Sequence, residues 1–333
     1  MTSPAPRPET IEKLANGVYP AFAMLAGMQL DLFTPLTDGP MTAAQLADTL
    51  GVGSAKLQPL LYALVVAGLL TVDGERFANT PEANSFLVRG SPTYLGGMQG
   101  NFVRQWNGTL KTAASIQTGT AQDKIDFSAM SSEAGEAFFR QLHAGALTTG
   151  RELVARYDFS SYRTLVDVGG GSGGLAIALT EACPHLQATV VDLPTVTPIT
   201  QRFVAEAGAA ARVQVLAADV VQGPLTGVYD VAVLRAFIQV LAPEQARRAL
   251  RHISHVIAPG GAIYIIGNAI LDNTRTAPLA AVAFSLYLLN AVDGGQAYTE
   301  QEHRDWLTEA GFVGCDRVTL PNGWGIVSAR KAA

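Results

Sequence analysis

The sequence predicts an α/β protein with a doubly wound, mostly parallel sheet, preceded by an all-helical, winged-helix dimerisation domain. Three observations favour this class. Five short apolar segments alternate with helical stretches after Thr164, a glycine-rich turn follows the first of them, and the first 90 residues carry short helices followed by a hairpin. We therefore expect a winged-helix domain over residues 1–90, a helical bridge over 91–160 and the sheet domain over 161–333.

The composition is that of a globular protein with little affinity for polyanions. Hydrophobic residues make up 48% of the 333 residues and charged residues only 15%, which excludes a disordered tail or a coiled coil. The formal net charge of −5 disfavours nucleic acid and anionic membranes as partners. Because the charged fraction is low, we expect part of the surface to be buried against a second copy in a homodimer.

Cysteine usage and the start of the chain indicate a cytoplasmic protein. Cys183 and Cys315 show no metal-ligand spacing, so we expect neither a metal site nor a disulfide framework. No basic stretch leads into an apolar one at the start, and no apolar run reaches the ~18 residues of a membrane span.

The N-terminal domain resembles a DNA-reading module in pattern but not in charge. Thr42 and Ser54 are expected to cap two successive helices, and Asp73-Gly74 is expected to turn a short hairpin. Helix, turn, helix and hairpin make a winged helix. Residues 1–100, however, carry five Lys or Arg against eight Asp or Glu, so dimerisation is favoured over DNA binding.

The bridge is predicted to contain two long helices, and the sheet domain five strands. The helices are expected over Tyr94 to Thr118 and Ser131 to Tyr157, with a polar loop from Gly119 to Ser128. The predicted strands cover residues 164–168, 188–193, 213–219, 230–235 and 262–268. Strands that alternate with helices form a mostly parallel sheet, whose ligand site lies at the carboxyl ends of the strands.

A glycine-rich turn and three carboxylates mark that site. Gly169 and Gly171 follow the first strand and allow close backbone approach to a ligand. Asp167 precedes them, where a carboxylate repels a pyrophosphate but holds an ammonium group. Asp192 ends the second strand, placed for ribose hydroxyls, and Asp219 ends the third, placed for an adenine amino group.

The runs DVGGGSGG, VVDLP and AADV resemble the cofactor signature of class I S-adenosylmethionine-dependent methyltransferases, whose domain is Rossmann-like. With the winged helix, the bridge and the GGQAYTEQEHRDWLTEAGF segment, the chain is similar to the small-molecule O-methyltransferases. The resemblance implies S-adenosylmethionine as cofactor and a small-molecule acceptor. By this resemblance the cofactor's amino-acid part is contacted by Gly169 and Gly171, its ribose by Asp192 and Leu193, its adenine by Asp219 and Val220, and its carboxylate lies near Arg235.

The chain departs from this family at the catalytic base. Members place a histidine after the fourth strand, and here Gln239 stands in that position. The two glutamates that hold the histidine in plant members align with about Gly267 and Ser328. An amide can orient an acceptor but cannot deprotonate it, so we expect catalysis by positioning.

A missing base leaves several acceptors open. A thioether sulfur has no proton to lose, and we favour it, as in the family branch that S-methylates 4-methylthio-2-hydroxybutyrate. Phenolic or enolic oxygen and electron-rich carbon are the alternatives, because an acidic phenol is partly ionised already. A relative that binds the cofactor without methylating, and an ordinary hydroxyl served by another base, also stay open.

His143 is the candidate for that other base. It lies on the bridge helix, which in the family covers the substrate. We expect His185, His252 and His255 to be structural or solvated, and His303 to lie on the surface of an amphipathic helix.

The acceptor pocket is expected to draw on three segments. Phe138, Phe139, Gln141 and His143 come from the bridge, Phe237 and Gln239 from the segment after the fourth strand, and Phe284, Tyr287, Leu288 and Asn290 from the helix after the fifth. Packing in the core is the alternative role of these aromatic residues. Arg104, Arg140 and Arg151 are candidate partners for an acidic acceptor.

Overall fold

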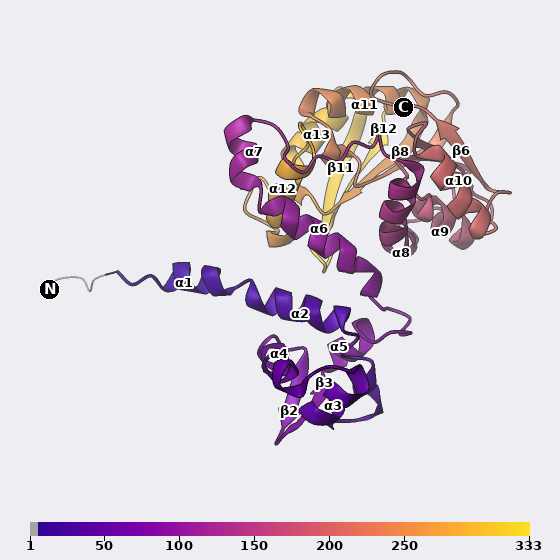
Figure 1. The fold of residues 1–333 in the computed structure, drawn as a ribbon. Helices are drawn as coiled ribbons and strands as arrows, with labels where there is room; N and C mark the ends of the chain where they lie inside the picture. Colours follow the sequence, from indigo (N-terminus) through magenta and orange to yellow (C-terminus); the bar gives the residue numbers. More distant parts are fainter. Residues whose placement is uncertain (1–5) are drawn as a thin grey trace. The chain divides into compact units, whose positions relative to one another are not determined.

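The computed structural model describes residues 6–333, which form two compact units divided between Val103 and Arg104 (Figure 1). The division falls inside the segment 91–160, so helix α6 (Gln99–Thr109) runs across it. Each unit has a hydrophobic core of its own.

The first unit consists of helices around a small antiparallel sheet of order β1-β3-β2. The predicted hairpin is present, with Asp73 paired to Arg76 across the turn. The core includes Leu32, Phe33 and Phe77. Its elements are α1 (Glu9–Asn16), α2 (Tyr19–Gln29), η1 (Pro35–Asp38), β1 (Met41–Thr42), α3 (Ala43–Leu50), α4 (Ser54–Val66), β2 (Leu70–Asp73), β3 (Arg76–Asn79), α5 (Pro81–Phe86) and η2 (Gly96–Met98).

One of the two predicted helix caps is confirmed and the other is wrong. Thr42 caps α3 in a capping box, in which its hydroxyl accepts from the Gln45 N–H and the Gln45 side chain accepts from the Thr42 N–H. Ser54 does not cap α4. Gly53 occupies the cap position in extended conformation, so Ser54 is already the first helical residue and its side chain makes no capping bond.

The second unit is built on a seven-stranded sheet of order β11-β12-β8-β7-β4-β5-β6. All five predicted strands are present and mutually parallel, and β12 and β11 extend the sheet as an antiparallel hairpin. Its strands are β4 (Thr164–Val168), β5 (Gln187–Asp192), β6 (Val213–Ala217), β7 (Tyr229–Arg235), β8 (Ile257–Gly267), β11 (Phe312–Thr319) and β12 (Gly325–Lys331). Two further strands, β9 (Ile270–Leu271) and β10 (Tyr298–Thr299), form a separate two-stranded parallel sheet.

Helices cover both faces of this sheet (Figure 1). Residues of α8, α9 and α10 pack on one face, and residues of α11 and α13 on the other. The helices are α7 (Thr112–Thr118), α8 (Ser132–Arg156), α9 (Gly174–Ala182), α10 (Thr197–Glu206), η3 (Ile238–Val240), α11 (Pro243–Val256), α12 (Leu279–Ala291) and α13 (Glu300–Glu309). The strand order reverses between β4 and β7, since β5 and β6 lie on one side and β8 on the other. Ligands of doubly wound sheets bind at that point.

The bridge helices agree with prediction in one case only. The helix predicted from Ser131 to Tyr157 is confirmed as α8, with Ser131 as its cap. The helix predicted from Tyr94 to Thr118 is wrong, because η2, α6 and α7 divide that segment. Glycines at 96, 97 and 108 weaken a continuous helix there.

Within residues 6–333, no single helix combines the length and apolarity needed to cross a membrane. The helices α3 and α4 reach that length only as a pair bent by 113°.

Candidate active site

The glycine loop after β4 requires glycine for two separate reasons. Gly169 and Gly171 have φ of 66° and 56°, which side chains rarely adopt. Both also lie against aromatic rings. A Cβ on Gly169 would stand 2.4 Å from the Phe237 ring, and one on Gly171 would stand 2.7 Å from the Phe139 ring. Two rings from the predicted acceptor side therefore contact the predicted cofactor loop.

Asp167 is the most unusual charged group of the site. Its side chain is fully buried, and neither carboxylate oxygen has a hydrogen-bond partner. Burial raises the pKa of Asp167 to about 7, and the nearby Asp192 carboxylate adds to the shift. The nearby Ala176 N–H and, to a smaller extent, the Arg235 charge favour the charged form but do not overcome these effects. A buried carboxyl group without a partner is ready to accept hydrogen bonds from a cationic ligand.

The other two predicted carboxylates, Asp192 and Asp219, accept hydrogen bonds from backbone N–H groups of nearby loops. Asp192 accepts hydrogen bonds from the N–H groups of Gly171 and Leu193, both at 2.8 Å, and so fixes the glycine loop. Burial nevertheless raises its pKa. Asp219 accepts from the Val221 N–H, which forms a turn after β6. Val220 is buried, and its carbonyl bonds the ring of His252.

Arg235 ends β7, on the other side of the strand-order reversal from the glycine loop. Its Nε donates to the Thr149 hydroxyl at 3.1 Å, and its guanidinium stacks on the Trp324 ring at 4.7 Å. Burial lowers the pKa of Arg235 to about 10, so the group keeps its positive charge at neutral pH. It faces the same buried region as Asp167.

Gln239 lies in η3 and is 7% exposed. Its Nε2 donates to Asn268 Oδ1 at 3.1 Å, and its Oε1 lies against Gly267, where a Cβ would stand 2.7 Å away. The position thus holds two neutral amides. Neither amide can take a proton from an acceptor near neutral pH.

His143 lies against the glycine loop. Its Nδ1 is 2.9 Å from the Ser172 hydroxyl, and its ring packs on Phe203 at 4.6 Å. Burial, with a contribution from the Arg140 charge, lowers the pKa of His143, so the ring is neutral at neutral pH. Its observed contacts join α8 to the start of α9 and to α10.

An aromatic cluster gathers the predicted residues of α8 and α12. Phe138 packs on Phe139 at 5.2 Å, and Phe284 packs on Tyr287 at 5.3 Å. The Arg104 guanidinium joins the two pairs, at 5.0 Å from the Phe138 ring and 5.4 Å from the Tyr287 ring, and it donates to the Tyr287 hydroxyl.

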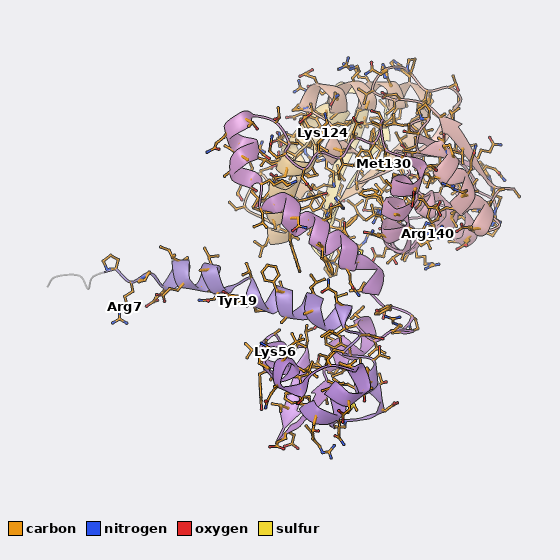
Figure 2. All side chains as sticks on the ribbon, viewed as in Figure 1. Arg7, Tyr19, Lys56, Lys124, Met130 and Arg140 are labelled. Carbon is orange, nitrogen blue, oxygen red and sulfur yellow. The ribbon has the colours of Figure 1, made fainter. Side chains whose placement is uncertain are left out.

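In the described part of the chain, the other five predicted residues make no hydrogen bond, ion pair or ring contact with the glycine loop or the aromatic cluster. Asn290 is fully buried and fastens α12 to α7, since it donates to Thr112 and accepts from Ser115. Arg140, labelled in Figure 2, forms ion pairs with Glu136 and Glu206. Arg151 lies 4.0 Å from Glu181. Gln141 is half-buried on α8, and Leu288 packs in the small core under α12.

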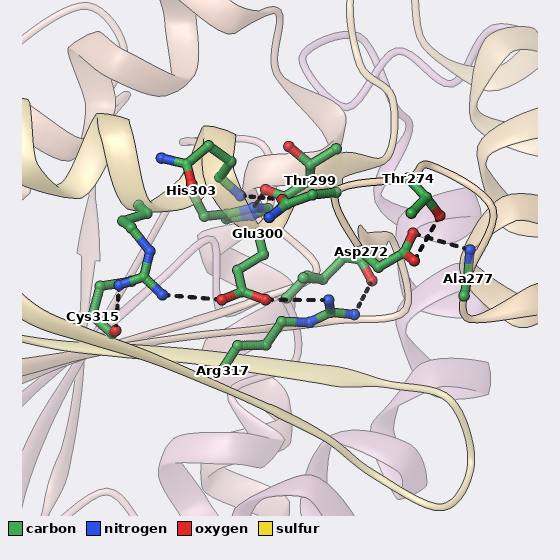
Figure 3. A network of polar contacts seen from close by, with 12 residues as sticks. Asp272, Thr274, Ala277, Thr299, Glu300, His303, Cys315 and Arg317 are labelled. Atoms are coloured by element: carbon green, nitrogen blue, oxygen red, sulfur yellow. Dashed lines mark hydrogen bonds and ion pairs between the residues drawn. The ribbon is translucent and has the colours of Figure 1, made fainter.

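The expectation for His303 is wrong. It is 2% exposed, and its Nδ1 bonds the Thr299 carbonyl at 2.8 Å. Figure 3 shows it within a polar network in which Glu300 pairs with Arg317, and Arg317 also donates to the carbonyl of Ile270. The short pairing of β9 with β10 draws this helix end inward, which the amphipathic pattern does not indicate.

Several residues of the site were not predicted. Ser172 could have been chosen from its place in the glycine run. Thr149, Thr200, Asn268 and Trp324 carry no such signal, because they meet the site only through the fold; Thr200, for example, donates to the Gly171 carbonyl at 2.6 Å. Among the described residues 6–333, no three His, Cys, Asp or Glu side chains are placed to hold a metal ion.

Comparison with protein families explains this arrangement. Residues 110–313 match the O-methyltransferase domain, and residues 12–89 match the O-methyltransferase dimerisation domain. The chain belongs to the O-methyltransferase family. It is therefore a methyltransferase that uses S-adenosylmethionine and acts on small molecules. The buried Asp167 carboxyl without a partner fits the ammonium group of that cofactor.

Relatives of this O-methyltransferase match it over nearly its whole length. The 3-hydroxy-5-methyl-1-naphthoate 3-O-methyltransferase of Streptomyces sahachiroi is 31% identical over 98% of this chain and 96% of its own. The N,N-dimethyltransferase OxyT of Streptomyces rimosus is 31% identical over 93% and 92%. Human N-acetylserotonin methyltransferase in complex with S-adenosylmethionine has the same fold, with 24% identity, a TM-score of 0.82 and full coverage of both chains.

Proposed function

We propose that this methyltransferase acts on an acidic oxygen, phenolic or enolic, of a small aromatic molecule that binds as its anion. The observation that carries the proposal is a pair of neutral amides, the buried Gln239 and the half-buried Asn268, where a base is expected. When bound, S-adenosylmethionine supplies a methyl group on a positively charged sulfur. An acceptor that arrives ionised has no proton to lose, so Gln239 need only orient it.

We infer the roles of the cofactor-side residues from their surroundings. Asp167 would hold the ammonium group, because its carboxylate is buried and unpartnered. Arg235 would hold the carboxylate, since Thr149 and Trp324 fix its guanidinium nearby. By the family resemblance, and not by their surroundings, Asp192 and Leu193 would bind the ribose, and Asp219 and Val220 the adenine.

The acceptor oxygen is favoured over sulfur by the relatives. The names of the two Streptomyces relatives give an oxygen and a nitrogen acceptor, and neither gives sulfur. A thioether sulfur remains the second candidate because it too needs no base. The aromatic cluster around Phe138 and Tyr287 suits a planar acceptor better than a short aliphatic thioether.

The test is release of S-adenosylhomocysteine from a panel of phenols, enolic keto acids, catechols and thioether acids, followed by pH profiles. We expect turnover of phenols, with a kinetic pKa that follows the acceptor. A nitrophenol should reach its plateau at lower pH than an ordinary phenol of pKa about 10. Gln239→Ala should lower kcat by about tenfold, equivalent to ~1.4 kcal/mol.

Two outcomes contradict the proposal. Turnover of thioethers alone would show that the acceptor atom is sulfur and not oxygen. A single kinetic pKa shared by all phenols and lost in His143→Ala would make His143 the base. A kinetic pKa that moves with the phenol and survives in His143→Ala supports the proposal.

We also infer a homodimer formed through α1 and α2. Ile11, Leu14, Tyr19 and Phe22 on these helices are 50% to 70% exposed, a large apolar surface for one short segment. This segment overlaps the match to the dimerisation domain.

A charge on this surface is expected to separate the two copies. Leu14→Glu with Phe22→Glu should change the mass measured by light scattering from dimer to monomer. Leu279→Glu, at a residue 80% exposed in the other unit, is the matched control and should remain dimeric. A monomeric wild-type protein, or a dimeric double variant, would contradict this interface.

A further inference from the structure

Asn268 is a polar residue that contacts Gln239 in the candidate active site. It follows β8 directly, is half-buried, and accepts the hydrogen bond of Gln239 through Oδ1. The two residues are far apart in sequence and meet because β7 and β8 are neighbouring parallel strands that end at the same edge.

The surroundings leave Gln239 little freedom. Gly267 makes room for the Gln239 side chain, because a Cβ there would lie 2.7 Å from Oε1. Gly295 packs on the backbone of the same turn, where a Cβ would lie 2.4 Å from the Gln239 carbonyl oxygen. The Tyr298 hydroxyl donates to the Leu241 carbonyl one residue beyond η3. Backbone contacts thus fix η3, and Asn268 fixes the amide at the end of the side chain.

The hydrogen bond to Asn268 determines which way the Gln239 amide faces. One N–H of Nε2 is directed to Asn268 Oδ1, and Oε1 is directed to Gly267. A primary amide has two N–H groups, so the second remains for an acceptor oxygen. Without Asn268, the amide could rotate and present its oxygen to the acceptor, which repels an anion.

We propose that Asn268 is a positioning residue for methyl transfer, which holds the Gln239 amide so that its free N–H binds the acceptor oxygen. This inference rests on the proposed function, in which Gln239 orients the acceptor. Asn268 acts through Gln239, so its contribution disappears when Gln239 is absent.

The experiment is a double-mutant cycle with Asn268→Leu and Gln239→Ala, on the acceptor of highest turnover in the panel. Leucine has a similar size but no acceptor atom. We expect Asn268→Leu to lower kcat about tenfold, with the Kd for S-adenosylhomocysteine within twofold of wild type, and to have no further effect in the Gln239→Ala background. Asn273→Leu is the matched control, because Asn273 accepts one backbone bond in the loop after β9.

A second readout does not depend on turnover. The side-chain amide signals of Gln239 in a ¹⁵N spectrum, assigned by their loss in Gln239→Ala, should shift towards the positions of a solvated glutamine amide in Asn268→Leu and stay in place in Asn273→Leu. Equal losses of kcat in both backgrounds, or unchanged amide signals, would overturn the inference. A panel without phenol turnover would defeat the proposed function alone, because the amide signals still report whether Asn268 holds Gln239.

Discussion

The affinity of this enzyme for S-adenosylmethionine is expected to fall about tenfold per pH unit below pH 7. Burial raises the pKa of Asp167 to about 7 in the free protein, and the carboxyl must ionise to bind an ammonium group. Binding therefore releases a proton at pH below 7. The α-amino group of the ligand loses its proton at about pH 8, so affinity should peak between these values. Isothermal titration calorimetry in buffers of different ionisation enthalpy measures both the affinity and the number of protons released on binding.

Asp167→Asn should weaken binding by about 100-fold, or ~2.7 kcal/mol, and should remove the fall in affinity below pH 7. The same change should stabilise the folded protein at pH 8. A carboxyl whose pKa is higher in the folded state binds more protons there than in the unfolded state, so stability falls as pH rises from about 4 to 7. Asparagine cannot ionise, so the variant does not lose this stability, and the Tm of Asp167→Asn at pH 8 should exceed that of the wild-type protein.

Asp158→Asn is the control for Asp167, because Asp158 is an exposed residue that only caps a turn at Ser160. Asp158→Asn should change neither the affinity for S-adenosylmethionine nor the fall in that affinity below pH 7. Affinity that stays constant between pH 5.5 and 7 would mean that Asp167 is already ionised in the free protein, and would contradict this prediction.

Gly169→Ala is expected to destabilise the protein by about 2–4 kcal/mol and to abolish cofactor binding. Alanine at a φ of 66° costs ~1–2 kcal/mol for its backbone conformation alone. The added Cβ would also overlap the Phe237 ring, which must move. Urea denaturation gives the stability change and calorimetry the loss of binding.

Gly208→Ala separates the two contributions. Gly208 has nearly the same φ, 63°, but nothing lies within 4 Å of its added Cβ, so only the conformational cost applies. Adding Phe237→Ala to Gly169→Ala should recover the part due to overlap. Equal destabilisation at positions 169 and 208 would show that Phe237 does not restrict the loop.

The sheet and the cofactor loop could be predicted from the sequence because both have local signals. Buried parallel strands read as short apolar runs, and the turn after Val168 reads as glycines. The predicted helix cap at Ser54 shows how a local signal can fail, because the preceding Gly53 occupies the N-cap position instead. His303 fails differently, because a short strand pairing that no periodicity indicates draws it into the core.

The acceptor side was predicted less well for a related reason. Gln239 was found by its departure from a family pattern, but Asn268 could not be, since their contact depends on two strands ending side by side. Asn290 was placed on the correct helix, and its side chain turns to α7 instead. Secondary structure gives the position of a residue along an element but not the partner that its side chain selects.

The reversal of strand order between β4 and β7 has a consequence for how this enzyme can diversify. The residues assigned to the methyl donor lie at or just beyond the carboxyl ends of β4, β5, β6 and β7, whereas α12 belongs to a separate segment between β9 and β10. Because α12 is proposed to line the acceptor pocket, substitutions along it are expected to change the acceptor without changing the affinity for the donor. New acceptors can arise on this scaffold while the glycine loop after β4, where an added Cβ would meet Phe237 and Phe139, stays unchanged.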